Sequence, residues 1–336
     1  MYTLKTVKGY KSKLSLRDTE RAIKLVKDEF EKNLARALNL ERISAPLFVK
    51  SRSGINDDLN GVDRAVSFDI KEIENSSAEI IHSLAKWKRV ALKNYGFNVG
   101  EGLYTDMNAI RRDDALDNIH SIYVDQWDWE VIITKEQRKT AFLKKVVNKI
   151  AGAIIKTQNK LIKRFPALTT SLTKKVFFIT SQQLENMYPK LTSKEREHKI
   201  TEIHKTVFIA KIGYALKSGN RHDGRAPDYD DWDLNGDLLF WNDVLKESIE
   251  LSSMGIRVDA DSLKKQLKIS GHEERLQYDY HKDIISSSLP LTIGGGIGQS
   301  RLCLLLLQKL HIGEVQVSIW PDEMLEKCEE QKINIL

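Results

Sequence analysis

Two long β-rich segments of this chain follow one another with no helix between them. They are "EGLYTDMNAI", residues 101–110, and "HSIYVDQWDWEVII", residues 120–133. The other β-rich segments are far apart, and helical segments are inserted between them without a strict alternation. A doubly wound parallel sheet requires strands and helices to alternate regularly. The order of the segments therefore predicts an α+β fold in which helices flank an antiparallel β-sheet.

Two segments have the periodicity of amphipathic helices. Residues 15–39 repeat apolar side chains at helical spacing and begin at Ser15, whose hydroxyl can cap the first turn. Residues from about 135 to 170 are expected to form a helical insertion whose apolar stripe includes Val146, Ile150 and Ile154. Because no internal repeat or low-complexity linker divides the sequence, we expect residues 1–336 to form a single domain.

The positive charge is concentrated in the second of these helices. The chain has 53 Lys and Arg against 47 Asp and Glu, a net charge of +6. Residues 135–175 contain twelve Lys and Arg and only one acidic residue, Glu136, so the rest of the chain carries a net negative charge. A solvated helix face explains these lysines, and a surface for a polyanion is the alternative.

Composition and apolar runs limit where the protein can work. The longest uninterrupted apolar run, residues 302–307, is much shorter than the roughly 20 residues that a membrane helix needs. The N-terminal residues do not begin a secretory signal, and Cys303 and Cys328 form no C-x-x-C pair. We therefore expect a cytoplasmic protein without a membrane partner, a disulfide or a thiolate metal site.

A further β-rich segment, "RISAPLFV" at residues 42–49, is interrupted by Pro46. We expect one strand there. Proline cannot donate a hydrogen bond to a neighbouring strand, so this strand should lie at a sheet edge or at an interface.

Four glycines lie between an apolar segment and a Leu-rich helical segment in "LTIGGGIGQSRLCLLLL", residues 291–307. Glycines before a helix N-terminus can hold a phosphate, and they can also form a plain tight turn. The sequence matches neither G-x-G-x-x-G nor the P-loop pattern, because Arg301 stands where a third glycine would be and no Gly-Lys follows. The unusual feature is this arginine, one turn into an otherwise apolar helix.

Polar and aromatic residues alternate in "YVDQWDWE", residues 123–130. Successive side chains of a strand point to opposite faces of the sheet. Gln126, Asp128 and Glu130 should therefore line one face, with Trp127 and Trp129 on the other. Three adjacent acceptors on one face predict a binding site.

Carboxylates gather in "RHDGRAPDYDDWDLNGD", residues 221–237, where we expect an ordered acidic loop suited to Mg²⁺ or to an ammonium group. A solvated acidic loop is the alternative. Three other strings carry charged or hydroxyl groups: "HSLAKWK" with Ser83 and Lys88, "IRRDD" with Arg111, and "ELSSMGIR" with Glu250 and Arg257. Arginines for phosphate and carboxylates for a metal indicate an ATP-dependent activation of a carboxylate.

These strings together resemble a known family. "GGGIGQSRL", the "IRRDD" and "YVDQWDWE" pair, and the helix leading into "ERISAPLFV" look like motifs 3, 2 and 1 of class II aminoacyl-tRNA synthetases. The longer strings "GEGLYTDMNAIR", "RAPDYDDW" and "ELSSMGIRVDAD" resemble the ammonia-dependent asparagine synthetases, or aspartate–ammonia ligases, built on that fold. The resemblance extends from about residue 5 to residue 320.

The resemblance implies a homodimer built on a class II synthetase-like catalytic core. It implies synthesis of asparagine from L-aspartate, ATP and ammonia through a β-aspartyl adenylate, with release of AMP and pyrophosphate. No nucleic-acid partner is expected, because the first core-like helix begins near residue 15 and leaves no room for an anticodon-reading domain. The absence of a cysteine near the N-terminus favours free ammonia over glutamine as the nitrogen donor.

The same resemblance suggests roles at the nucleotide. Arg111 would hold the α-phosphate and stabilise the transition state, and Arg301 would contact the nucleotide. The peptide groups of Gly294 and Gly296 would let the adenosine lie close, and Ser253 would donate a hydrogen bond. Asp237 and Glu250 are the expected Mg²⁺ ligands.

Aspartate and ammonia require separate groups. The β-carboxylate must be activated, so we expect Arg257 to hold the α-carboxylate, with Ser83, Lys88 and Gln126 around it and Asp128 on the α-amino group. A carboxylate must also take a proton from ammonium, and the candidates are Asp57 and then Asp230.

Two other functions remain open from the sequence. One is a synthetase-like relative that adenylates a different amino acid or transfers it to a protein. The other is a nucleic-acid-binding regulator that uses the basic helix on a degenerate synthetase fold.

Overall fold

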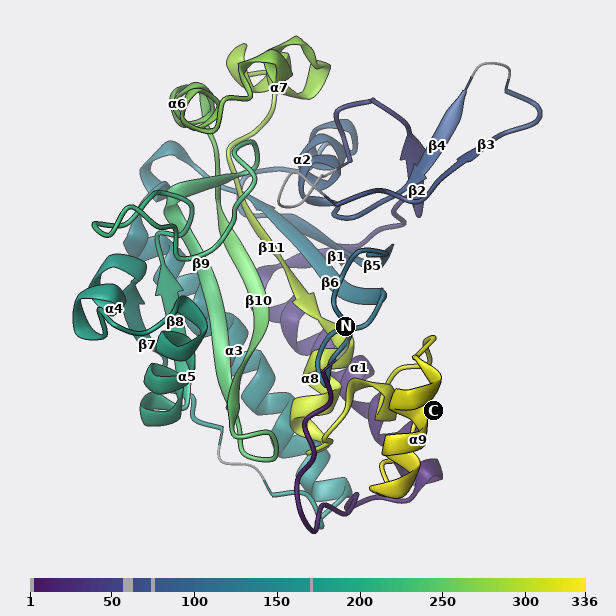
Figure 1. The fold of residues 1–336 in the computed structure, drawn as a ribbon. Helices are drawn as coiled ribbons and strands as arrows, with labels where there is room; N and C mark the ends of the chain where they lie inside the picture. The colour runs from purple at the N-terminus through teal and green to yellow at the C-terminus, as the bar shows by residue number, and fades with distance from the viewer. Residues whose placement is uncertain (1–2, 57–62, 74–75, 170–171) are drawn as a thin grey trace.

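A mixed sheet of eight strands forms the centre of the computed structural model, which describes residues 3–56, 63–73, 76–169 and 172–336 (Figure 1). The strand order is β1-β5-β6-β11-β10-β9-β8-β7. Neighbours from β5 to β8 pair antiparallel, and only the two edge pairs, β1 with β5 and β7 with β8, are parallel. The sheet confirms the expected α+β arrangement.

The strands of this sheet are β1 (Leu40–Arg42), β5 (Gly102–Ile110), β6 (Tyr123–Ile132), β7 (Phe177–Thr180), β8 (Thr206–Ala210), β9 (Asp230–Asn242), β10 (Glu247–Arg257) and β11 (Thr292–Gly298). The α-helices of the described residues are α1 (Leu16–Leu38), α2 (Ala85–Asn94), α3 (Thr140–Arg164), α4 (Ser181–Met187), α5 (Ser193–His204), α6 (Ala260–Ser270), α7 (Asp279–Ile285), α8 (Gln299–Leu306) and α9 (Asp322–Glu330). Short 3₁₀ turns occur at Lys135–Gln137, Glu273–Gln277 and Ile312–Glu314.

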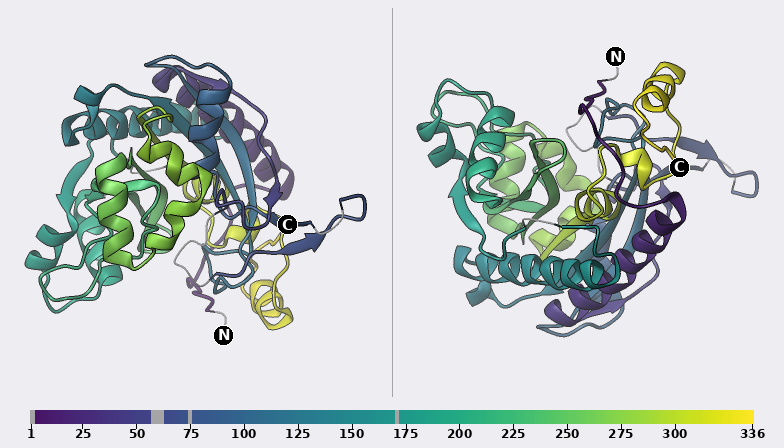
Figure 2. Two further views of the ribbon diagram at one scale, coloured as in Figure 1. Left: turned by 90° about the horizontal axis from the view of Figure 1, so that it is seen from above. Right: turned by 90° about the horizontal axis from the view of Figure 1, so that it is seen from below.

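Helices α1 and α3 lie side by side across one face of the sheet (Figure 2). The Ser15 hydroxyl accepts a hydrogen bond from the amide of Asp18, so α1 begins where the sequence predicts. Phe30 and Leu34 of α1 are buried, as are Val146 and Ile150 of α3. Helices α2 and α5 also pack on the central strands of the sheet.

A second, three-stranded antiparallel sheet projects from the main body (Figure 1). It consists of β2 (Phe48–Lys50), β4 (Ser77–Ile80) and β3 (Ser67–Asp69), in the order β2-β4-β3. The prediction of one strand through residues 42–49 is therefore wrong, because Pro46 separates β1 from β2 and the two strands join different sheets.

No helix in the described parts of the chain is both long enough and apolar enough to cross a membrane.

Candidate active site

A cavity of about 650 Å³ lies on the face of the large sheet opposite α1. Gln126 and Asp128 of β6 line it, whereas Trp127 and Trp129 point to the other face and are buried. Trp127 packs against Phe30 of α1, with ring centroids 4.7 Å apart. The alternation predicted for β6 is thereby confirmed, and it separates the hydrophobic core from the polar cavity.

Lys88 of α2 is fully buried beside the polar face of β6. Its ammonium group forms an ion pair with Asp128, donates to the carbonyl oxygen of Gly295 at 3.0 Å, and lies 3.9 Å from Glu130. Burial lowers the pKa of Lys88, although Asp128 opposes the shift. The Oδ2 atom of Asp128 is buried and has no hydrogen-bond partner among the described residues.

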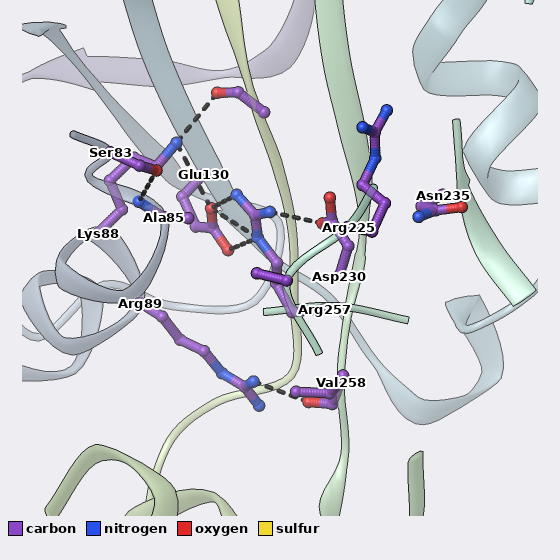
Figure 3. A network of polar contacts seen from close by, with 12 residues as sticks. Ser83, Ala85, Lys88, Arg89, Glu130, Arg225, Asp230, Asn235, Arg257 and Val258 are labelled. Atoms are coloured by element: carbon purple, nitrogen blue, oxygen red, sulfur yellow. Dashed lines mark hydrogen bonds and ion pairs between the residues drawn. The ribbon is translucent and has the colours of Figure 1, made fainter. Parts of the chain in front are cut away.

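Arg257, at the end of β10, is held between two carboxylates (Figure 3). Its Nε and Nη2 donate to Glu130 at 2.9 and 2.7 Å, and its Nη1 donates to Asp230 at 2.6 Å. All three side chains are almost completely buried. Burial alone would raise the pKa of Glu130, but the guanidinium of Arg257 reverses the shift and lowers it.

Asp230 lines the cavity and differs from Glu130 in its electrostatics. Burial raises the pKa of Asp230 despite the guanidinium of Arg257, and Glu130 adds to the increase. A carboxyl group with a raised pKa is a reasonable proton acceptor near neutral pH. Asp57, the other candidate base, lies outside the described residues.

The glycine run forms part of strand β11 and leads directly into α8, so the alternative of a plain tight turn is wrong. Gly294 lies opposite Glu130, Gly296 opposite Asp128 and Gly298 opposite Gln126. A Cβ atom on Gly294 would overlap the Glu130 carboxylate, and one on Gly296 would overlap the Gln126 amide. These glycines therefore make room for the polar side chains of β6.

Only part of the glycine run reaches the cavity. Gly295, Gly296 and Gly298 line it, whereas Gly294 lies against Glu130 and Arg257. The expected contact of Gly296 with adenosine is compatible with this position, but Gly294 belongs structurally to the Arg257 pocket.

Two arginines, Arg111 and Arg301, line the cavity together with residues 119–121. Arg301, in the first turn of α8, donates to the carbonyl oxygen of Glu250 at 3.0 Å. The Nε atom of Arg111 is buried and lacks a hydrogen-bond partner among the described residues. Both arginines lie close to Asp114, where burial raises the pKa against their opposing effect. The arrangement supplies positive charge for an anion.

Three further predicted residues also line the cavity: Ser83, Glu250 and Ser253. The Ser83 hydroxyl accepts from the amide of Ala85 at the start of α2. Of the described residues predicted for the site, only Gly294 and Asp237 lie off the cavity lining.

The acidic string forms a loop only over residues 221–229, so the prediction of a loop is wrong for residues 230–237. Strand β9 begins at Asp230, and alternation along the strand sends its carboxylates to different cations. Asp231 pairs with Arg138, and Asp233 lies 3.4 Å from Lys211. Asp228, just before the strand, is buried between Lys86, Arg275 and His281.

Asp237 and Glu250, the predicted Mg²⁺ ligands, lie on the paired strands β9 and β10. Burial raises the pKa of Asp237 to about 8, with Arg225 opposing the shift and Glu250 adding to it. Arg225 forms an ion pair with Asp237 and lies 3.4 Å from Asp223. Carboxylate oxygens are the donors that Mg²⁺ prefers, but the guanidinium of Arg225 already neutralises part of the charge at this place.

A metal at this place would need other ligands as well. Among the residues that the structure describes, no group of three or more His, Cys, Asp or Glu side chains is arranged to hold a metal ion. Two carboxylates suit Mg²⁺ only when phosphate oxygens or water complete its octahedral shell.

Sequence reasoning missed three features of this site. The alternation of β6 places Glu130 on its polar face but does not indicate its pairing with Arg257, and the acidic string does not by itself indicate the pairing of Arg225 with Asp237. His120, which lines the cavity, is held by Asp117 through its Nδ1 atom at 2.8 Å. A charge of opposite sign inside a run of carboxylates was the available signal for Arg225.

Comparison with known proteins gives the family. A family model described as aspartate-ammonia ligase matches residues 17–332. The chain belongs to the aspartate–ammonia ligase family. An aspartate–ammonia ligase of Clostridium tetani is 60% identical over 329 residues, covering 98% of this chain and 96% of that protein. One of Ruminiclostridium cellulolyticum is 56% identical over the full length of both chains.

Solved structures of asparaginyl-tRNA synthetases share the fold of this chain. Asparaginyl-tRNA synthetase of Pyrococcus horikoshii, complexed with asparaginyl-adenylate, superposes with a TM-score of 0.66 at 15% identity, covering 90% of this chain and 70% of that one. Asparaginyl-tRNA synthetase of Entamoeba histolytica gives a TM-score of 0.65 at 15% identity, and this chain spans 66% of it. At such low identity these matches show the fold alone, and they confirm the class II synthetase-like core.

Proposed function

We propose that this chain synthesises asparagine from L-aspartate, ATP and ammonia through a β-aspartyl adenylate, releasing AMP and pyrophosphate. The family to which the chain belongs supports the overall reaction. The roles of individual residues are inferred from the cavity.

Two buried polar atoms in one cavity carry the proposal. Arg111 Nε is a donor and Asp128 Oδ2 an acceptor, and neither has a hydrogen-bond partner among the described residues. Leaving such groups unpaired costs about 1–3 kcal/mol each, so a ligand that satisfies them is favoured. A phosphate suits the first atom and an ammonium group the second. ATP and the α-amino group of aspartate provide these two groups.

Aspartate would bind with its α-carboxylate at Arg257. Because Nε and Nη2 of Arg257 donate to Glu130 and Nη1 donates to Asp230, one N–H remains on each of Nη1 and Nη2. The buried ammonium of Lys88 and the amide of Gln126 would complete the clamp, with Ser83 beside them. A complex with the β-carboxylate on Arg257 would contradict this orientation.

Adenylation then joins the β-carboxylate to ATP. A carboxylate oxygen attacks the α-phosphorus, and the bond from that phosphorus to the bridging oxygen of pyrophosphate breaks. Arg111 would stabilise the charge that develops on the α-phosphate, and Arg301 and Ser253 would hold the nucleotide. Gly296 would allow the adenosine to approach the sheet. Mg²⁺, when held by Asp237 and Glu250, would neutralise the outer phosphates.

Ammonia completes the reaction. A carboxylate removes a proton from ammonium, the nitrogen lone pair attacks the acyl carbon, and the C–O bond to AMP breaks. The nitrogen loses a second proton to the phosphate of the departing AMP, which leaves the neutral amide. We retain Asp57 as the first candidate for this base and Asp230 as the second. If Asp57→Asn left both adenylation and the ammonia step unimpaired, the base would have to be another group.

Aspartate-dependent exchange of pyrophosphate into ATP tests adenylation, and asparagine formation with ammonium in the absence of RNA tests the second step. We expect both to occur. Exchange without asparagine would favour a relative that adenylates for another purpose, and no exchange would favour a binding protein. The homodimer and the cytoplasmic location remain proposals that rest on the family.

A further inference from the structure

Arg225 lies where the predicted metal ligands converge. It belongs to the segment between β8 and β9, and its side chain is 11% exposed. Its Nη2 donates to Asp237, and its Nη1 donates to the carbonyl oxygen of Gly224 at 2.9 Å and lies 3.4 Å from Asp223. Its Nε is buried without a hydrogen-bond partner among the described residues. In Figure 3 it lies beside Asp230.

The surroundings of Arg225 are strongly acidic. Asp223, Asp237 and Glu250 all act electrostatically on its guanidinium, and Glu250 and Asp223 also act on Asp237. Buried carboxylates at such close range repel one another unless a cation lies between them. The guanidinium of Arg225 provides that cation.

A divalent metal on Asp237 and Glu250 would compete with this guanidinium. Two cations beside the same buried carboxylate repel each other in a medium of low dielectric constant. Arg225 also lines the cavity, so its side chain has space to turn toward a nucleotide. Phosphate oxygens are good bidentate partners for a guanidinium.

We propose that Arg225 is a resident cation that holds Asp223, Asp237 and Glu250 together in the empty enzyme and is displaced when a divalent metal enters with ATP. The proposal rests on the proposed function, because it takes ATP as the source of the phosphates that receive the guanidinium. It follows that the free metal binds weakly on its own, and that the metal and the nucleotide enter together.

Titration with Mn²⁺ in the absence of ATP and aspartate tests the exchange. Free Mn²⁺ is followed by electron paramagnetic resonance in wild-type protein and in Arg225→Gln. Removing the guanidinium should tighten Mn²⁺ binding at least tenfold. A matched control is Arg221→Gln, which removes an exposed arginine of the same segment that lies 5.5 Å from the Trp232 ring and should leave the affinity unchanged.

Two further variants locate the effect and guard against misfolding. Arg225→Lys keeps the positive charge and should bind Mn²⁺ as weakly as wild type. The double variant Arg225→Gln with Asp237→Asn should lose the gain in affinity. Equal Mn²⁺ affinity in wild type and folded Arg225→Gln, or a gain that survives Asp237→Asn, would overturn the proposal. Because the titration needs no turnover, pyrophosphate exchange by wild type tests the proposed function separately.

Discussion

Buried ionic groups dominate the site at the scale of single residues. The site contains a chain of side chains with alternating charge, in the order Asp128, Lys88, Glu130, Arg257 and Asp230. Each of them is nearly inaccessible to solvent. Removing one partner from such an arrangement leaves an uncompensated charge, whereas the intact arrangement contributes little net stability. Its value to the protein is geometric, since it fixes Arg257 before any ligand arrives.

Replacing Glu130 with Gln should therefore impair aspartate binding more than the chemical step. The amide keeps the shape of the side chain but loses the charge that orients Arg257, so the KM for aspartate in pyrophosphate exchange should rise about tenfold with a smaller change in kcat. We also expect a loss of about 3 kcal/mol in the free energy of unfolding.

Glu136→Gln is the matched control for this change. Glu136 is exposed in the 3₁₀ turn Lys135–Gln137 and does not line the cavity. Kinetic constants like those of wild type are expected for it. A Glu130→Gln enzyme with an unchanged KM for aspartate would show that Arg257 does not depend on this carboxylate.

Strand β11 illustrates how one element depends on its neighbours. Its glycines allow β6 to place carboxylate and amide groups over the strand, so the backbone of β11 becomes the floor of a polar cavity. Glycine lowers the stability of a strand, but a larger side chain at these positions would collide with those groups.

Gly294→Ala tests that role. The added methyl group would overlap the Glu130 carboxylate and press on the Arg257 guanidinium, so the fold should lose about 2 kcal/mol or more of stability. The matched control is Gly152→Ala in the middle of α3, where a Cβ meets nothing within 4 Å. It should stabilise the protein by about 0.5–1 kcal/mol through helix propensity. Urea unfolding measures both, and equal effects of the two substitutions would contradict this account of Gly294.

Elements with a self-contained pattern could be predicted from the sequence. The apolar period of α1 and α3 and the alternation of β6 depend only on residues within each segment, and all three were located correctly. The glycine strand, the split at Pro46 and the pairing of Arg225 with Asp237 depend on which segments become neighbours. The pattern within one segment does not show which other segment will pack beside it. The motifs therefore predict the residues of the cavity but not the ion pairs between them.

The two cysteines report on the integrity of the whole molecule. Cys303 and Cys328 are both buried, and burial raises their pKa values to about 12 and about 11. The thiolate is the reactive form, so neither should react with a thiol reagent at pH 8 while the protein is folded. Absorbance with an aromatic disulfide reagent should show no labelling without urea and two labelled thiols in urea. Rapid labelling of one thiol in native protein would contradict the structure around it.

His311 connects acid stability to the packing of the C-terminal segment. It is completely buried, it packs against Trp320 with ring centroids 4.7 Å apart, and its Nδ1 accepts from the amide of Gly313 at 3.0 Å. Burial lowers the pKa of His311 to about 4, although Asp117 opposes the shift. In the unfolded chain a histidine titrates at about 6.5, so between these values the unfolded state binds the extra proton.

Stability from His311 should therefore be complete above about pH 6.5 and be lost as the pH falls toward 4, by up to about 3 kcal/mol. In His311→Gln, whose amide oxygen can still accept from Gly313, the free energy of unfolding should fall less steeply over this range. Urea unfolding at half-unit steps of pH gives both curves. Since acidic residues titrate in both proteins, the difference between the curves isolates the imidazole. Parallel curves would mean that His311 becomes protonated without leaving its buried position.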